Sequence, residues 1–168
     1  MRQPSASGIP APRRMEIVIA AVGRPRAGPL ADAIRQYETR AARYWPLAAR
    51  EVRAEPARGT SVHQVREREG ERLLAALGSA TVVACDAEGD ALTSDAFARW
   101  LQAERERAGP DLAFCIGGAF GLSDTMLRRA TRRIAFSRWT MSHELARLVL
   151  AEQLYRAGTI VRGEPYHK

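Results

Sequence analysis

The C-terminal end of the chain gathers side chains that could act on a nucleic acid. Tyr166, His167 and Lys168 end the chain, and Arg156 and Arg162 lie shortly before them. A tyrosine ring can stack on a base, an imidazole can take or give a proton near neutral pH, and a cationic group can bind phosphate. Together these residues are suited to holding an unstacked RNA base, although a terminus of this kind is, taken alone, more typical of an idle chain end.

A second candidate is the glycine loop, Gly117-Gly118-Ala119-Phe120-Gly121, which follows an apolar strand and precedes a helix. Open α/β sheets bind their ligands at this kind of position, and glycine lets the backbone approach a ligand closely. The loop matches neither the dinucleotide fingerprint G-x-G-x-x-G nor the P-loop. It therefore predicts a ligand-binding turn or, equally well, a tight connection between strand and helix.

Other chemistries find little support. The three histidines, His63, His143 and His167, form no zinc spacing with cysteine or aspartate, and no G-x-S-x-G elbow is present. Cys85 and Cys115 fall within predicted strands, where free thiols pack as small hydrophobic groups in a reducing cytosol. We expect no metal and no serine-type hydrolysis.

The elements that must position these residues alternate along the chain. Apolar runs predict strands at 16–22, 49–54, 81–86, 111–116 and 133–139, and helices are expected at 30–44, 61–77, 95–108, 124–131 and 144–157. Strands of this kind are continuously apolar, which is typical of a sheet covered on both faces. The pattern predicts an α/β fold with a largely parallel sheet.

One domain is expected over residues 15–168, because a chain of 168 residues with 46% hydrophobic residues can bury one good core. Residues 1–14 are rich in Pro, Ser and Gly and predict a disordered N-terminal extension. Export is not expected, since the apolar run after residue 16 is short, and no stretch could span a membrane. We expect a cytoplasmic protein.

Positive charge lies at the two ends of the chain. Residues 125–168 carry nine Arg or Lys against three acids and residues 1–14 carry three Arg, whereas residues 15–124 carry 14 basic and 16 acidic side chains. Counterion release favours clustered arginine at a polyanion. The charge therefore predicts a polyanionic partner, the alternative being an arginine-rich solvated surface.

The predicted last helix is apolar on nearly all sides, with Leu145, Leu148, Val149, Leu150 and Leu154 covering most directions. A surface helix needs only one apolar stripe. We expect this helix to pack on its own sheet and against a second copy of the chain.

Three segments, in this order, resemble one family: the strand and glycine loop from Phe114 to Gly121, the helix Arg147-Leu-Val-Leu-Ala-Glu-Gln-Leu-Tyr-Arg-Ala157, and the terminal Pro165-Tyr166-His167-Lys168. The chain is similar over residues 15–168 to the ribosomal RNA large subunit methyltransferase H family. The resemblance implies a parallel-sheet SPOUT fold with a C-terminal trefoil knot, and a homodimer. It also implies S-adenosyl-L-methionine as cofactor and methylation of N3 of a pseudouridine in large-subunit (23S) rRNA on the assembled ribosome.

The family's site residues carry over to positions of this chain. The cofactor contacts correspond to Cys85, Gly117, Phe136, Ser137, Arg138, Trp139, Thr140 and Met141. The substrate-side residues correspond to Arg156, Tyr166 and His167, for which we expect phosphate or oxyanion contact, base stacking and proton transfer, respectively.

Some positions depart from the family pattern. Many relatives carry Pro-Glu where this chain has Ala119-Phe120, and Ser142 stands where some have Pro. His143 stays outside the predicted catalytic set, because a residue at a helix start is as typical of capping as of RNA contact. The alternatives to the family's reaction are a SPOUT methyltransferase that acts on tRNA and a non-catalytic ribosome-binding factor.

Overall fold

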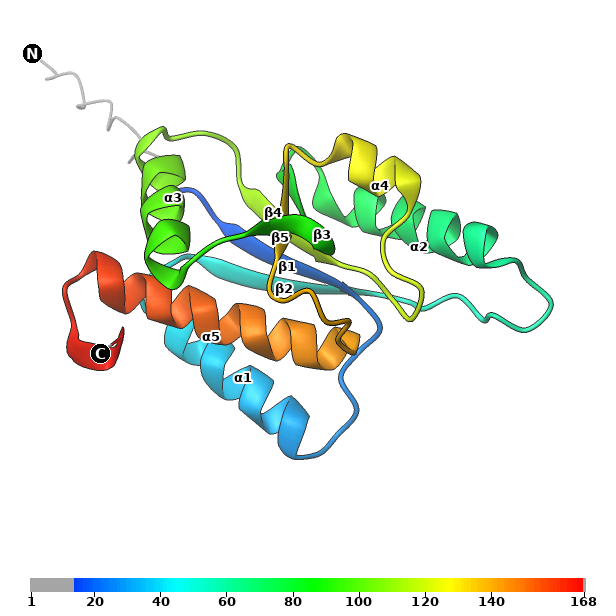
Figure 1. Ribbon diagram of the computed structural model, residues 1–168, viewed down its shortest axis with the longest axis horizontal. Helices are drawn as coiled ribbons and strands as arrows, with labels where there is room; N and C mark the ends of the chain where they lie inside the picture. Colours follow the sequence, from blue (N-terminus) through cyan, green and yellow to red (C-terminus); the bar gives the residue numbers. More distant parts are fainter. Residues whose placement is uncertain (1–13, 168) are drawn as a thin grey trace, which may run out of the picture.

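A five-stranded parallel sheet forms the centre of the protein, whose computed structural model describes residues 14–167 (Figure 1). The sheet order is β2-β1-β4-β3-β5. The strands are β1 Ile17–Val22, β2 Leu47–Val52, β3 Thr81–Ala91, β4 Leu112–Ile116 and β5 Arg132–Ala135. This confirms the predicted α/β class, while the trefoil knot stays a prediction. The predicted disordered extension falls almost wholly outside the described residues.

Helices cover both faces of the sheet (Figure 1). They are α1 Pro29–Ala41, α2 Val62–Leu77, α3 Ser94–Glu106, α4 Asp124–Arg129 and α5 His143–Val161, followed by the short 3₁₀ helix η1 Pro165–His167. Ser61, Thr93, Ser123 and Ser142 each accept a backbone N–H with their side chain and so fix the start of α2, α3, α4 and α5. No helix in the described part of the chain is long and apolar enough to cross a membrane.

The side chains of strand β1 contribute to two hydrophobic cores, one on each face of the sheet. Ile17, Ile19 and Ala21 pack with residues of α3 and α5, whereas Val18 and Val22 pack with residues of α2 and α4. All six residues of β1 and all five of β4 are buried. Alternate side chains therefore point into opposite layers, which explains why these strands are continuously apolar.

Two elements differ from their predicted extents near the C-terminus. β5 ends at Ala135, and residues 136–142 form a loop rather than a continued strand. α5 runs through Gly158 to Val161 instead of ending before that glycine. A Cβ at position 158 would lie 2.7 Å from Cδ2 of Tyr44, so this glycine serves close packing rather than helix termination.

The apolar character of α5 has a partial explanation within one chain. α5 lies beside α1 and also packs on α3 and the sheet (Figure 1). These neighbours account for Leu150, Ala151 and Leu154, which are fully buried. The two-sided pattern does not by itself require a second copy, although Leu145 near the start of the helix stays 42% exposed.

We predict that Gly158→Ala lowers the free energy of unfolding by about 1–3 kcal/mol, because the added methyl group forces the Tyr44 ring to move within a packed helix contact. Chemical denaturation monitored by circular dichroism measures the change. Gly109→Ala is the matched control, since its Cβ would meet nothing within 4 Å. Equal stability of the two variants would contradict the packing role of Gly158.

Candidate functional site

A pocket of about 350 Å³ lies at the edge of the sheet where β4 and β5 end, beside the middle of β3. Seven of the eight residues predicted to contact the cofactor line this sheet-edge pocket. They are Cys85 from β3, Gly117 from the glycine loop, and Phe136, Ser137, Trp139, Thr140 and Met141 from the loop that leads to α5. Residues that are distant in the sequence therefore meet because parallel strands end at a common edge.

The glycine loop needs its glycines for two different reasons. Gly121 has a φ of 81° and donates its N–H to the carbonyl of Gly118 at 3.1 Å, which closes the turn. A Cβ on Gly117 would lie 2.7 Å from the backbone nitrogen of Leu122, where nothing can move aside cheaply. The loop thus folds back on its own backbone and presents main-chain groups to the pocket.

β3 contributes an irregularity to the pocket wall. The register between β3 and β5 shifts between Cys85 and Asp90, and Asp86 and Ala87 of this bulge line the pocket. Arg133 forms an ion pair with Asp86. Arg138, the predicted cofactor residue that does not line the pocket, donates Nη1–H to the carbonyl of Ala87 at 3.1 Å. Arg138 therefore ties the loop before α5 to the bulge.

The Cys85 thiol is held in its neutral, protonated form. Burial, reinforced by the nearby Cys115 and Asp86, raises its pKa well above the ordinary value. Burial also raises the pKa of Cys115 to about 12. Both thiols are protonated at neutral pH, so Cys85 offers the pocket a small, neutral wall rather than a reactive group.

A buried carboxylate lies under the glycine loop. Glu69 of α2 is 4% exposed, its Oε1 accepts the backbone N–H of Glu55 at 2.9 Å, and burial raises the pKa of its carboxyl group. A Cβ on Gly118 would lie 2.7 Å from Glu69 Oε2. The second glycine of the loop is therefore required by the carboxylate beneath it.

A buried ion pair fixes the first turns of α5 relative to the pocket. Arg147 is 5% exposed, donates from Nε to Glu38 of α1 at 2.7 Å and from Nη1 to Glu51 of β2 at 2.7 Å. One turn earlier, His143 lines the pocket. Arg147 thus joins α1, β2 and α5 at the end of the helix that carries His143.

The predicted substrate-side residues lie elsewhere. Arg156 is 13 positions after His143 on a continuous helix, and thus about 20 Å farther along the axis. The C-terminus lies beyond one end of α5, and the loop that enters the pocket lies at the other (Figure 1). Neither Arg156 nor Tyr166 lines the pocket. One chain therefore does not bring its two predicted sets of site residues together.

Arg156 and Tyr166 do form a common cluster around Glu152. Arg156 donates from Nη2 to Glu152 Oε1 at 2.6 Å, and the Tyr166 hydroxyl donates to the same oxygen at 3.1 Å. The Arg156 guanidinium lies 4.8 Å above the centre of the Tyr166 ring. Burial and hydrogen bonds to Tyr37 and Glu152 raise the pKa of Tyr166, so its hydroxyl stays protonated. The prediction for the His167 imidazole falls outside the side chains that the structure describes.

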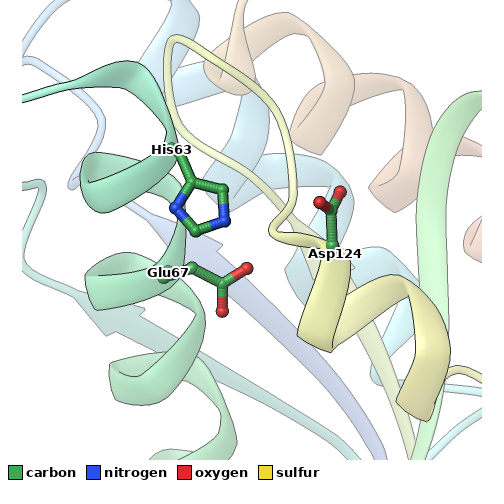
Figure 2. A group of neighbouring side chains, drawn as sticks. All are labelled: His63, Glu67 and Asp124. Carbon is green, nitrogen blue, oxygen red and sulfur yellow. The ribbon is translucent and has the colours of Figure 1, made fainter.

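One further group carries the donor types of a metal site. Atoms of His63 and Glu67 on α2 and of Asp124 at the start of α4 lie within 4.8 Å of one another (Figure 2). Two of the three have protein partners: Asp124 pairs with Arg66 at 3.1 Å, and a hydrogen bond from Thr125 lowers the pKa of Glu67. These interactions join α2 to α4, so the group has a structural role in the packing of the two helices. The expected absence of a metal stays a prediction.

Sequence reasoning did not assign Phe120 or Asp86 to the site and left His143 outside it, although all three line the pocket. The position of Asp86 directly after the predicted cofactor residue Cys85 was an available signal. Glu69 gave no signal, because a carboxylate in the charged segment 66–72 is typical of an exposed helix face.

Comparison with known proteins decides the family. The family model described as "Predicted SPOUT methyltransferase" matches residues 15–167. The chain belongs to the SPOUT methyltransferase family. Within it, the chain is 57% identical over 155 residues to the ribosomal RNA large subunit methyltransferase H of Gemmatimonas aurantiaca, covering 92% of this chain and 100% of that protein. It is 42% identical to the protein of that name from Geobacter sulfurreducens, over 91% of this chain and 99% of the relative.

The solved structures support the same fold. A probable methylase family protein from Haemophilus influenzae superposes with a TM-score of 0.56 at 14% identity, covering 92% of this chain and 71% of the other. This similarity concerns the fold alone. The sequence relatives confirm the resemblance to the ribosomal RNA large subunit methyltransferase H family, which rested on the glycine loop, the last helix and the terminal residues.

We predict that the stability of the SPOUT domain falls as the pH drops below about 4.5, the ordinary pKa of a glutamate. Partial burial alone would raise the pKa of Glu51, but hydrogen bonds from Arg147 and Arg24 outweigh it and lower the pKa. A carboxyl group with a lowered pKa stabilises the fold above its ordinary pKa and loses that contribution as it is protonated.

Replacement of Arg147 should weaken this acid dependence. Arg147→Met is expected to lower the free energy of unfolding at pH 7 by about 3 kcal/mol and to flatten its fall with acid. Denaturant titrations between pH 7 and pH 3.5 measure both effects. Arg24→Ala is the control, because the Arg24 side chain is 84% exposed and its pair with Glu51 should contribute less than about 1 kcal/mol. A similar loss in both variants would contradict this assignment.

Proposed function

We propose that this protein is an S-adenosyl-L-methionine-dependent methyltransferase that modifies large-subunit rRNA in the cytoplasm. The observation that carries the proposal is the convergence of Cys85, Gly117 and the loop before α5 on one pocket, because the family resemblance predicts cofactor contacts at these positions. The curated relatives that match nearly the whole chain are named as ribosomal RNA methyltransferases, and the basic C-terminal third suits an RNA substrate.

The residues of the pocket fit such a cofactor. Its volume of about 350 Å³ is in the range of small-molecule sites. Gly117 lines the pocket and lets the loop fold closely on its own backbone, and the Cys85 thiol is neutral. The cofactor, when bound, supplies an electrophilic methyl group. The loops contribute by orienting that group toward the acceptor, since alignment of donor and acceptor supplies much of the rate of a displacement.

We further propose that the enzyme works as a homodimer in which each active site uses two chains. The long, continuous helix α5 keeps Arg156 and Tyr166 about 20 Å from the end that enters the pocket. If two copies pair along α5 in opposite directions, the C-terminal residues of one copy approach the pocket of the other. The exposed Leu145 and the partly exposed Leu148 and Val149 would lie at that contact.

The acceptor that we propose is N3 of a pseudouridine on the assembled ribosome. This nitrogen carries a proton that must leave during methyl transfer. His167 is the residue whose ordinary pKa suits the role of proton acceptor. Arg156, held by Glu152, can stabilise negative charge that develops on the base oxygens, and the ring of Tyr166 can stack on the base.

Methyl transfer from radiolabelled cofactor to ribosomes that lack the modification tests the function. We expect one methyl group per large subunit, located by mass spectrometry on one pseudouridine. Transfer to tRNA instead would favour a tRNA enzyme, and a folded protein that binds no S-adenosylhomocysteine would favour a non-catalytic ribosome-binding factor.

Gly117→Ala should weaken S-adenosylhomocysteine binding about ten-fold or more by calorimetry, because the added Cβ deforms the loop. Gly109→Ala should leave it unchanged.

Mixed dimers test the shared site. Gly117→Ala impairs the pocket and His167→Ala is expected to impair proton transfer, so each homodimer should be nearly inactive. Co-expression should restore up to about one quarter of wild-type activity, since half of randomly paired dimers are mixed and each then holds one intact site. Activity of the mixture that merely equals the mean of the two homodimers would show that one chain supplies both sets of residues.

A further inference from the structure

Two large aromatic side chains stand exposed at the sheet-edge pocket. Trp139 is 84% exposed and Phe120 is 41% exposed, and both line the pocket. Tryptophan is highly buried on average in folded proteins, so exposure of this extent at a binding pocket needs a specific reason. Within residues 14–166, neither ring pairs with another aromatic ring.

The sheet topology places the loops that carry the two rings on either side of β3. Phe120 belongs to the loop after β4, and Trp139 to the loop after β5. In the sheet, β3 lies between β4 and β5, so the two loops leave the sheet about 10 Å apart, which is two strand spacings. A planar ring stacked between two others needs about 7 Å between the outer planes, at the usual contact distance of about 3.5 Å. Side chains that lean inward from these loops can enclose one ring.

The backbone that presents Trp139 is held in place, while its side chain is free. The backbone N–H of Trp139 donates to Ser137 Oγ at 2.9 Å, and Arg138 binds the carbonyl of Ala87 on the β3 bulge at 3.1 Å. On the other side, the N–H of Gly121 closes the glycine loop just after Phe120. Both supports are thus ordered before a ligand arrives, which lowers the entropy lost on binding.

We propose that Phe120 and Trp139 form an aromatic clamp that stacks a planar heteroaromatic ring at the mouth of the sheet-edge pocket. The proposal rests on the proposed function, which brings two such rings to this place: the adenine of the methyl donor and a base of the RNA acceptor. Aromatic faces stack on either ring with little regard to its hydrogen-bonding groups. Stacking of this kind acts on binding, so the clamp determines affinity rather than the rate of the chemical step.

The surroundings favour a ring over a second copy of the chain as the occupant. Leu145, another large exposed hydrophobic residue near the start of α5, does not line the pocket, whereas both aromatic rings do. The pocket lining combines small residues such as Cys85 and Ala87 with larger apolar side chains such as Phe136 and Met141. A concave, largely apolar lining of this kind is suited to a small planar group rather than to a protein surface.

Tryptophan fluorescence tests the clamp in the intact protein. The chain has three tryptophans; Trp45 is 1% exposed and Trp100 packs against Phe97 and Phe114. A ring that stacks on Trp139 should therefore quench the solvent-exposed part of the emission. S-adenosylhomocysteine and an rRNA hairpin that contains pseudouridine are titrated separately, so that quenching by one and not by the other identifies the source of the ring. Trp139→Leu should abolish the quenching.

The affinity of the variants provides the second measurement. Trp139→Leu and Phe120→Leu should each raise the dissociation constant of the quenching ligand about five-fold or more, with the turnover number changed less than the Michaelis constant. Val62→Ala is the control, because Val62 is 50% exposed and does not line the pocket. Circular dichroism and thermal unfolding verify that the variants fold.

Three results would overturn the clamp. These are no quenching by either saturating ligand, unchanged affinities in both variants, or quenching that depends on protein concentration without ligand, which would assign Trp139 to an interface between copies. If the wild-type protein methylates rRNA, either of the first two results would refute the clamp alone. Failure of the wild-type protein to bind the cofactor and to methylate rRNA would refute the proposed function as well.

Discussion

Because all five strands run in the same direction, every connection from a strand to the following helix leaves from one edge of the sheet. This single constraint brings the bulge of β3, the glycine loop after β4 and the loop after β5 to one place. Each is irregular for its own reason: a register shift, a backbone that folds on itself, and a strand that ends at Ala135. The site is built from the places where regular structure stops.

The rigid helix α5 imposes the opposite constraint. It begins at the pocket, is anchored there by Arg147, and carries Arg156 and η1 away from it. At the far end, Glu152 orders Arg156 and Tyr166 without help from a ligand. Each chain thus presents two ordered clusters of side chains at opposite ends of one helix. If the two clusters meet across a dimer, as proposed, the surface that recognises the substrate is larger than one chain provides.

Much of this could be predicted from the sequence, and the reasons differ by element. β1 and β4 are long apolar runs without competing signals, and Ser123 and Ser142 mark helix starts. Gly158 misled the prediction of the end of α5, because its contact with Tyr44 depends on tertiary packing. Similarity to the family supplied Cys85 and residues 136–141. It did not reveal that Arg156 lies far from them, since a list of site positions contains no distances.

Gly118 and Glu69 lie 49 positions apart in the sequence, yet the carboxyl group of Glu69 occupies the space that a side chain at position 118 would need. Any side chain at position 118 would press on a carboxylate that has little room to retreat, and a shorter residue at position 69 would leave a void beneath the loop. The shape of the glycine loop therefore depends on a residue of α2 that does not line the pocket.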